Sequence, residues 1–457
     1  MTNKIYFVGA GGIGMANLVR YFLSQGAKVA GYDRTQTLLT DSLIEEGAEI
    51  VFTDDPALIP APMRSPEDTL VVYTPAVGDD NRILSYFRSH GFEVIKRARL
   101  LGIITRNSKG ICIAGSHGKT TTCSMTANIM RRTPHGVNAF LGGILRNTGS
   151  NLVLGKDSEY SIVEADEYDR SFHQLTPYIA VVTSCDPDHL DIYGDEEHYL
   201  EAFSIFSSLI HPGGALIMHT GLKMQPDLQP GVRLYTYSGG AEGDWHAEDI
   251  HYGEGTLSFT LVGPDGIRIP DIHLGVPVEI NIDNAVAAAA ASLLAGADPE
   301  DVKTGLADFK GARRRFEIHL DGKNGSPVLI DDYAHSPNEV AASISSVRKL
   351  YPGKKISVIF QPHLYTRTRD FAPEFAHALS LADEVIMPEI YPARELPIPG
   401  VDSNLILKDV KAQKKCFCLR KDLLDFIKNS NFEVLMTIGA ADLDVIIPDL
   451  KSALSDL

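Results

Sequence analysis

Residues 111–121, Ile-Cys-Ile-Ala-Gly-Ser-His-Gly-Lys-Thr-Thr, decide the fold of the region around them. The first four are apolar and predict a buried strand, and residues 122–130 predict a helix. A strand, a glycine loop with Lys-Thr and a helix form the arrangement in which backbone N–H groups bind nucleotide phosphates. The loop is short, because Ile113 stands where the usual motif has its first glycine. The pattern alone therefore leaves two interpretations, an ATP site and a chance glycine turn.

If the loop binds ATP, each residue type has a physical role. The lysine reaches the outer phosphates and the threonine hydroxyl can bind Mg²⁺. The candidate ATP-binding residues of the loop are Gly115, Ser116, His117, Gly118, Lys119, Thr120 and Thr121.

A second glycine loop, Gly-Ala-Gly-Gly-Ile-Gly, occupies residues 9–14. It follows a β-rich run at residues 4–8, precedes an amphipathic helix, and has Asp33 at the end of the next strand, which is the Rossmann fingerprint. Such a loop recognises a pyrophosphate rather than the group attached to it. NAD(P), another diphosphate and an ordinary strand–helix turn all remain open, and the candidate contacts are Gly11, Gly12, Ile13 and Gly14.

The bulk properties exclude several classes of partner. A net charge of −17 argues against nucleic acid or an anionic membrane surface. No apolar run approaches the roughly 20 residues of a membrane span, and no signal-peptide core follows Met1. The five scattered cysteines are typical of reduced thiols, so we expect a cytoplasmic protein without membrane insertion.

The length of 457 residues suggests three domains of about 150 residues. Strand and helix signals alternate along the chain, which favours an α/β fold with mostly parallel sheets. We expect a Rossmann-like domain at residues 1–105, a central P-loop ATPase-like domain at 106–310, and a C-terminal Rossmann-like domain at 311–457.

Acidic residues follow two predicted strands of the central region. Residues 164–169 come after a strand at 160–163, and residues 186–191 come after a strand that ends near Thr183. Carboxylates at the carboxyl ends of parallel strands face the ligand crevice, where a hard cation needs oxygen ligands. Thr120, Glu164 and His189 are therefore candidate metal ligands; a solvated acidic loop and a structural histidine are the alternatives.

Polar residues also follow two strands of the third segment. Residues 331–337 come after a strand at 328–330, and residues 361–369 come after one at 356–360. Arg367 suits a carboxylate, which its guanidinium can hold with two hydrogen bonds. Helix caps and surface ion pairs are the alternative. Residues 313–315, Arg-Arg-Arg, are either a solvated basic patch or a domain junction that places one arginine on a phosphate.

Taken in order, these blocks resemble the Mur ligase family of bacterial cell-wall enzymes. The resemblance is carried by residues 9–15, 118–122, 164–167, 188–189, 281–285, 314–316, 331–333 and 361–368. It implies that the N-terminal domain holds a UDP-sugar rather than a dinucleotide, with Gly11, Gly12, Ile13 and Gly14 on the diphosphate. The role of Asp33 stays open.

The resemblance also implies an ATP-dependent, amide-bond-forming ligase of peptidoglycan synthesis. L-alanine would be joined to the lactyl carboxylate of UDP-N-acetylmuramate through an acyl phosphate, with Lys119, Glu164, His189 and Arg367 as catalytic residues. The resemblance further implies that Thr120, Glu164 and His189 bind Mg²⁺ and that Tyr333 and Arg367 bind L-alanine. It also implies that ATP is bound by Asn281, Asn284, Arg315 and Asp332.

Three rival functions remain. A related recycling ligase joins a tripeptide to the same UDP-sugar, a NAD-dependent dehydrogenase would use the first glycine loop, and a UDP-sugar sensor would bind without consuming ATP. The chain also departs from the family pattern: Ser184 stands where Asn is frequent, and the Gly-His that usually precedes Asn281 is absent. We expect a monomer or homodimer.

Overall fold

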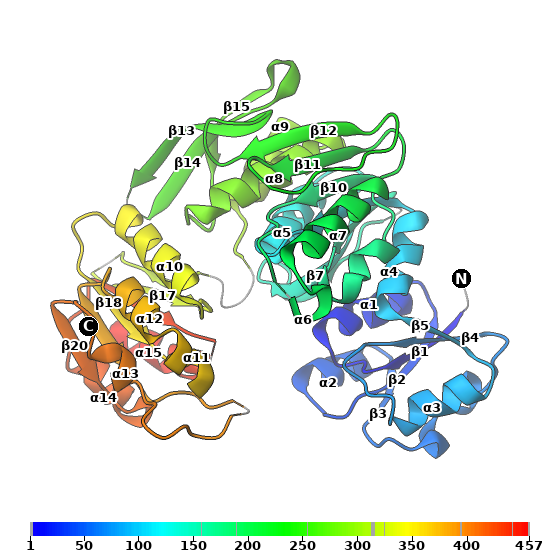
Figure 1. Ribbon diagram of the computed structural model, residues 1–457, viewed down its shortest axis with the longest axis horizontal. Helices are drawn as coiled ribbons and strands as arrows, with labels where there is room; N and C mark the ends of the chain where they lie inside the picture. The colour runs from blue at the N-terminus through cyan, green and yellow to red at the C-terminus, as the bar shows by residue number, and fades with distance from the viewer. Residues whose placement is uncertain are drawn as a thin grey trace. The chain divides into compact units, whose positions relative to one another are not determined.

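The computed structural model describes residues 3–156, 158–188, 190–253, 255–311, 316–323, 325–393, 395–440 and 442–455. The fold is mixed α/β with three sheets (Figure 1). The chain forms two compact units. The first contains Met1–Glu248, Leu261–Ile269 and Asp283–Leu306, and the second contains Asp249–Thr260, Pro270–Ile282 and Ala307–Leu457. Among the described helices, none has the length and apolar character needed to cross a membrane.

The first sheet lies in the N-terminal part of the first unit, and all its strands are parallel. Its order is β3-β2-β1-β4-β5, so the chain reverses its direction of winding between β1 and β4. The carboxyl ends of the strands at such a reversal form the usual ligand crevice. The strands are β1 (Lys4–Val8), β2 (Lys28–Tyr32), β3 (Glu49–Val51), β4 (Thr69–Tyr73) and β5 (Glu93–Lys96).

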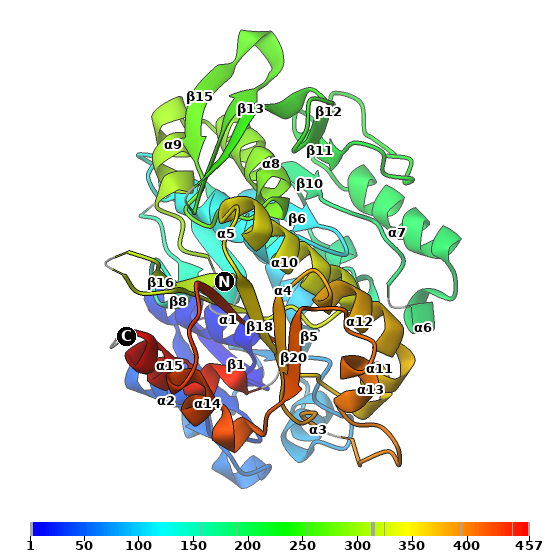
Figure 2. The same cartoon turned by 90° about the vertical axis from the view of Figure 1, so that its left-hand side faces the viewer.

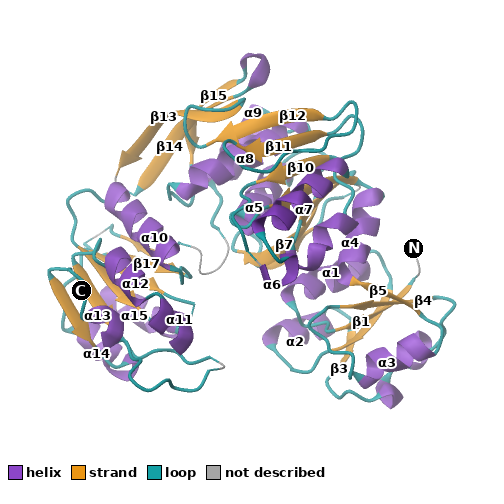
Figure 3. Cartoon of the chain, in the orientation of Figure 1, coloured by secondary structure: helices purple, strands orange, loops and turns teal. Residues whose placement is uncertain are grey.

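Helices cover both faces of this sheet (Figure 3). Successive side chains of a strand point to opposite faces. Ile5 and Phe7 of β1 therefore pack in one apolar cluster with α1, while Tyr6 and Val8 pack in another with α3. The helices are α1 (Ile13–Ser24), α2 (Leu38–Glu45), α3 (Arg82–Ser89) and α4 (Arg97–Arg106).

The second sheet has the order β15-β14-β13-β12-β11-β10-β6-β9-β7-β8. Strand β6 (Lys109–Ala114) is central and pairs in parallel with β9 and β10. The carboxyl ends of these three strands therefore lie side by side. The other strands are β7 (Asn138–Leu145), β8 (Ser150–Val153), β9 (Tyr160–Glu164), β10 (Ile179–Val182), β11 (Ala215–His219), β12 (Arg233–Ser238), β13 (Trp245–Gly253), β14 (Thr256–Val262) and β15 (Arg268–His273).

The predicted helix after the phosphate loop is present as α5 (Lys119–Met130), which begins three residues earlier than the sequence indicated. One continuous apolar cluster contains Phe7 of the first sheet together with Cys112 and Val163 of the second. This shared core joins the N-terminal and central parts into one unit. The other helices of the central region are the 3-10 helix η3 (Tyr168–Gln174), α6 (Leu190–Tyr193), α7 (Glu196–Ser208), α8 (Ile280–Leu294) and α9 (Pro299–Ala307).

The third sheet belongs to the second unit and has the order β16-β17-β21-β18-β19-β20. All its pairings are parallel except that of β16 with β17. Helices α14 and α15 pack their apolar residues against β17, β18, β19 and β21, and Figure 2 shows this sheet with its helices. The strands are β16 (Glu317–Asp321), β17 (Val328–Asp332), β18 (Ile356–Phe360), β19 (Glu384–Met387), β20 (Lys414–Phe417) and β21 (Val434–Ile438).

The helices of the second unit follow the strands in alternation, as the sequence predicted for an α/β region. Helix α10 begins with a capping box, in which the Ser336 hydroxyl and the Glu339 carboxylate each accept a backbone hydrogen bond. The helices are α10 (Pro337–Leu350), α11 (Tyr365–Asp370), α12 (Ala372–Leu379), α13 (Asn404–Leu407), α14 (Leu423–Lys428) and α15 (Ile447–Ser455).

Candidate active site

The N-terminal glycine loop connects β1 to α1 at the point where the first sheet reverses its winding. Gly9 has a φ of 88°, in the left-handed region that favours glycine. Helix α1 begins at Ile13 and has no side-chain cap. In this first turn the Met15 and Ala16 N–H groups donate to the carbonyl of Gly12, so the Ile13 and Gly14 N–H groups are the ones that face an anion, which the helix dipole also favours. The loop has the geometry of a phosphate site.

Asp33 holds this loop in place. Its carboxylate accepts hydrogen bonds from the Gly11 N–H at 2.7 Å and from the Thr35 N–H at 3.1 Å. A Cβ at residue 11 would lie 2.6 Å from Thr40 Cγ2 and 2.9 Å from Asp33 Oδ2, so a larger residue there would displace the Asp33 carboxylate. The structure thus gives Asp33 a role within the protein. Since the Gly11 N–H donates to Asp33 and the Gly12 N–H to the carbonyl of Gly9, the donors left to a ligand are the Ile13 and Gly14 N–H groups.

The central phosphate loop is shaped by two glycines and two neighbouring hydroxyls. Gly115 and Gly118 have φ values of 136° and 80°, and Gly118 precedes the first residue of α5. The His117 N–H donates to the Ser184 hydroxyl at 2.8 Å, and the Thr183 hydroxyl donates to the carbonyl of His117. Residues after β10 therefore hold the loop, and Ser184 performs this role where the family frequently has Asn.

Lys119 is paired with a buried carboxylate. Its Nζ atom lies 2.9 Å from Glu167 Oε1 and also donates to the carbonyl of Gly115. The Glu167 side chain is 2% exposed and that of Lys119 is 15% exposed. A buried carboxylate next to an ammonium group compensates its charge and fixes its position. Glu167 thus directs the predicted phosphate-binding lysine toward the loop.

Thr120 and Glu164 form the second contact of the loop. The Thr120 hydroxyl donates to Glu164 Oε1 at 2.8 Å, while Glu164 Oε2 is buried without a hydrogen-bond partner. Burial raises the pKa of Glu164, against the hydrogen bond from Thr120 and the charge of Lys119, which lower it. Glu164 is the last residue of β9 rather than the first of the following loop, because β9 pairs with β6 up to Ile113.

This oxygen pair fits a hard divalent cation. Mg²⁺ takes oxygen ligands, and the unpaired, buried Oε2 atom of Glu164 has the charge and the free lone pairs that such an ion needs. The third predicted ligand, His189, lies outside the described residues. Within the residues that the structure describes, no three His, Cys, Asp or Glu side chains form a metal cluster.

Asn284 lies next to the phosphate loop. Its Oδ1 atom accepts a hydrogen bond from the Thr122 hydroxyl at 3.1 Å, and a Cβ at Gly118 would lie 2.7 Å from the same oxygen. Although Asn284 is 162 residues from Thr122, α8 carries it to the start of α5. The structure therefore brings one of the predicted ATP-binding asparagines to the loop.

A cavity of about 210 Å³ connects the two glycine loops. Ile13 and Gly14 of the N-terminal loop line it, and so do Lys119 and Glu164 of the central site. Its other lining residues are Asn17, Arg97, Leu101, Phe140, Leu141, Gly142, Val163 and Asp166. A ligand group held on the N-terminal loop can therefore reach the phosphate loop inside one cavity.

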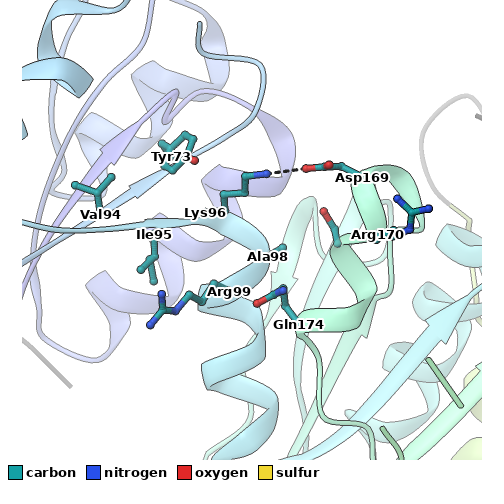
Figure 4. Close-up of a pocket in the computed structure, with 10 residues that line it drawn as sticks. Tyr73, Val94, Ile95, Lys96, Ala98, Arg99, Asp169, Arg170 and Gln174 are labelled. Atoms are coloured by element: carbon teal, nitrogen blue, oxygen red, sulfur yellow. Dashed lines mark hydrogen bonds and ion pairs between the residues drawn. The ribbon is translucent and has the colours of Figure 1, made fainter. Parts of the chain in front are cut away.

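A second cavity, of about 270 Å³, lies at the start of α4, where Ala98 and Arg99 line it (Figure 4). Tyr73 and Lys96, at the ends of β4 and β5, line it together with Asp169 and Arg170 of η3. Lys96 Nζ and Asp169 Oδ2 are 2.7 Å apart, and both side chains are close to half exposed. The Arg170 guanidinium lies over the Tyr193 ring, 4.8 Å from its centroid.

The remaining predicted residues belong to the second unit. Asp332 ends β17 and its Oδ1 atom accepts the Phe316 N–H at 3.1 Å, while Tyr333 follows it directly. Arg367 lies in α11, which follows β18. Because β17 and β18 both run parallel to β21, these residues come to the same edge of the third sheet. Asn281 donates to the carbonyl of Val276 at 3.1 Å, and Arg315 lies outside the described residues.

Three residues of the first site were not singled out from the sequence: Asn17, Arg97 and Glu167. Arg97 directly follows β5, and a cation at the end of a parallel strand next to the winding reversal is a signal that could have been used. Glu167 lies in the acidic block 164–169 but was not distinguished from its neighbours, and Asn17 carried no signal, because only the tertiary structure shows that their side chains are buried.

Comparisons with known proteins match most of the chain, from residue 4 to residue 433 for the family models. Three family models cover it: "Mur ligase family, catalytic domain" at residues 4–109, "Mur ligase middle domain" at 113–292, and "Mur ligase, glutamate ligase domain" at 314–433. Proteins named UDP-N-acetylmuramate–L-alanine ligase from Parabacteroides distasonis and Phocaeicola vulgatus are 55% and 54% identical over 453 residues. The aligned part is 99% of this chain and 97% and 98% of theirs.

Among solved structures, the UDP-N-acetylmuramate–alanine ligase of Thermotoga maritima aligns with a TM-score of 0.77 and 26% identity. The alignment covers 99% of this chain and 98% of that one. The order of strands and helices described above is thus shared over the full length.

Proposed function

Because this chain belongs to the Mur ligase family, we propose that it joins L-alanine to the lactyl carboxylate of UDP-N-acetylmuramate, consuming ATP, in peptidoglycan synthesis. The relatives at 55% and 54% identity bear the name of this ligase, and they favour L-alanine over the tripeptide of the recycling reaction. A family of ATP-dependent ligases also accounts for Lys119 and its loop, which a dehydrogenase would leave unexplained.

One observation carries the proposal: a single cavity is lined by both glycine loops. The reaction needs a carboxylate on one substrate to meet the γ-phosphate of another. The cavity, with a volume of about 210 Å³, holds only part of a UDP-sugar, since pockets that take a whole drug-sized ligand have volumes of about 300–1,000 Å³. The sugar end of the substrate therefore enters this cavity and the nucleoside lies outside it.

The chemistry follows from the poor reactivity of a free carboxylate. A lactyl carboxylate oxygen attacks the γ-phosphorus of ATP, ADP leaves, and an acyl phosphate forms. The amine of L-alanine then attacks the acyl carbon, inorganic phosphate leaves, and the nitrogen loses its proton as the amide forms. Because two anions must approach each other, positive charge placed in advance is the main catalytic requirement.

Lys119 supplies that charge at the β- and γ-phosphates, and Glu167 keeps its ammonium group within reach of the loop. Thr120 and Glu164 would hold Mg²⁺ together with His189. When bound, this ion would neutralise phosphate charge next to the incoming carboxylate. The Ile13 and Gly14 N–H groups at the start of α1 bind the diphosphate of the UDP-sugar, while Asp33 keeps their loop in shape.

The second unit would supply the remaining contacts. Asp332 is assigned to the ribose of ATP, and Tyr333 with Arg367 to L-alanine, whose carboxylate matches the guanidinium fork. Asn281, Asn284 and Arg315 would position ATP. This assignment is supported by the shared sheet edge of Asp332, Tyr333 and Arg367 in the second unit, and by the position of Asn284 at the phosphate loop in the first.

The test is a phosphate-release assay with ATP, Mg²⁺ and UDP-N-acetylmuramate, in which L-alanine, glycine, L-serine and the recycled tripeptide are offered separately. We expect release that depends on L-alanine. Lys119→Ala should abolish release while the folded variant still binds UDP-N-acetylmuramate. Release with the tripeptide alone would establish the recycling reaction instead, and binding without release under every condition would indicate a UDP-sugar sensor.

A further inference from the structure

Arg97 occupies a special position beside the N-terminal glycine loop. It begins α4, immediately after β5, and its guanidinium lies directly against Gly14 in the first turn of α1. A Cβ at residue 14 would overlap Nη1 of Arg97, so the guanidinium keeps this position because residue 14 is glycine. The cation thus lies at the helix terminus whose free N–H groups attract anions.

The charge of Arg97 is only weakly compensated. Its Nη2 atom lies 3.5 Å from Asp166 Oδ2, a long ion pair in which the side chains are 28% and 39% exposed. Lys119, the other cation that lines the cavity, has a 2.9 Å pair with buried Glu167. A partly exposed pair of this kind is worth little, so a phosphate can replace Asp166 at small cost.

A second feature shows that this part of the cavity is built for a polar ligand. Asn17, in the second turn of α1, is 3% exposed and lines the cavity. Its Nδ2 atom donates to the carbonyl of Leu141 at 3.3 Å, which leaves Oδ1 buried without a partner. A buried acceptor without a donor costs about 1–3 kcal/mol. A ligand that brings an N–H or O–H group would satisfy it.

We propose that Arg97 binds the sugar-proximal phosphate of the UDP-sugar, exchanging its contact with Asp166 for one with the phosphate. This inference rests on the proposed function. The sugar-proximal phosphate is the one concerned because Arg97 lines the cavity that continues to Lys119 and Glu164, where the sugar's carboxylate has to react. The residue binds substrate and positions the sugar end, and it takes no part in the transfer of the phosphoryl group.

The experiment measures the affinities of UDP-N-acetylmuramate, UDP and UMP by calorimetry for the parent protein and for Arg97→Met, Arg97→Gln and Arg97→Lys. Arg99→Met is the matched control. It removes the same charge two residues away, from an exposed arginine whose only ion pair among the described residues is with Glu93 at 4.0 Å. Fluorescence of the single tryptophan, Trp245, and a thermal melt verify that each variant is folded.

We expect Arg97→Met and Arg97→Gln to lower the affinities for UDP-N-acetylmuramate and UDP about 10- to 100-fold, the loss typical of a charged hydrogen bond. The affinity for UMP, which lacks the sugar-proximal phosphate, should change less than about two-fold. Arg97→Lys should recover part of the loss. The dependence of affinity on salt should decrease in Arg97→Met, which a purely structural change would not cause. Arg99→Met should bind all three ligands like the parent.

Three results would overturn the inference. Unchanged affinities in Arg97→Met would exclude any contact with the ligand. If the affinity for UDP-N-acetylmuramate fell but the affinity for UDP did not, Arg97 would contact the sugar or its carboxylate instead. If the affinity for UMP fell equally, Arg97 would contact the other phosphate. A parent protein that does not bind UDP-N-acetylmuramate would instead refute the proposed function, so the two failures are distinct.

Discussion

The pair of Lys119 and Glu167 allows a quantitative prediction about stability. Glu167→Gln keeps the shape of the side chain and removes its charge, which leaves the Lys119 ammonium in a largely buried position. At 2.9 Å and an effective dielectric constant of about 20, the attraction between the two charges is about 6 kcal/mol. Desolvation of both groups opposes it, and removing one partner of a buried pair typically costs about 3–5 kcal/mol.

We expect the lower end of that range, about 3 kcal/mol of unfolding free energy, since Lys119 is 15% exposed and retains its bond to the Gly115 carbonyl. Urea unfolding followed by the fluorescence of Trp245 measures it, because this tryptophan is 1% exposed and belongs to the same unit. Lys119→Met should cost a similar amount, for it leaves the Glu167 carboxylate buried alone.

The double variant Lys119→Met, Glu167→Gln decides the interpretation. It contains neither charge, so its stability should be higher than the sum of the two single losses predicts, by about 2–3 kcal/mol. Glu196→Gln removes the exposed pair with Lys223 and should cost under about 0.5 kcal/mol. If the free energy of unfolding of Glu167→Gln lies within about 0.5 kcal/mol of the parent's, the reasoning from burial is wrong.

Two further predictions concern Glu164 and His219. A Cβ at residue 142 would overlap Glu164 Oε2, so Gly142→Ala should displace the carboxylate and lower ATP-dependent turnover about 10- to 100-fold in the phosphate-release assay. Gly253→Ala is the control, because a Cβ there would have no described atom within 4 Å, and its turnover should equal that of the parent. Parent-like turnover of Gly142→Ala would contradict the metal-ligand role of Glu164. The Asp283 carboxylate, 3.0 Å from His219 Nε2, raises the pKa of His219 above its ordinary value. The pair therefore stabilises the fold fully below about pH 6.5 and loses this effect as the pH rises through the raised pKa. The stability difference between the parent and His219→Gln should be about 1 kcal/mol at pH 6 and smaller at pH 9, and a difference independent of pH would refute the ion pair.

Local patterns in the sequence predicted the fold well where a few adjacent residues determine the structure. The strand before Gly115, the helix after Lys119 and the turn at Gly9 each depend on hydrophobic periodicity or on backbone conformations that glycine permits. Element ends were less accurate: Glu164, Asp331 and Asp332 lie inside strands, because pairing with β6 and β21 extends the strands beyond their apolar residues.

The contacts within the site were not predictable in the same way. Asp33 is 22 residues from Gly11, Glu167 is 48 from Lys119, and Asp166 is 69 from Arg97. Each pair depends on which strands are neighbours and on how deeply a side chain is buried. The acidic stretch at residues 164–169 showed this clearly, since a solvated loop and a ligand site share the same composition.

The sequence by itself determined that this chain has two glycine loops, each between a strand and a helix, because each is a short, local arrangement of neighbouring residues. The blocks in their order indicated the family as well. Only the tertiary structure decided that both loops line one cavity, with Arg97 beside Gly14 and Glu167 holding Lys119. The reason is physical: backbone geometry is set by neighbours in the chain, whereas electrostatic pairing and burial are set by neighbours in space.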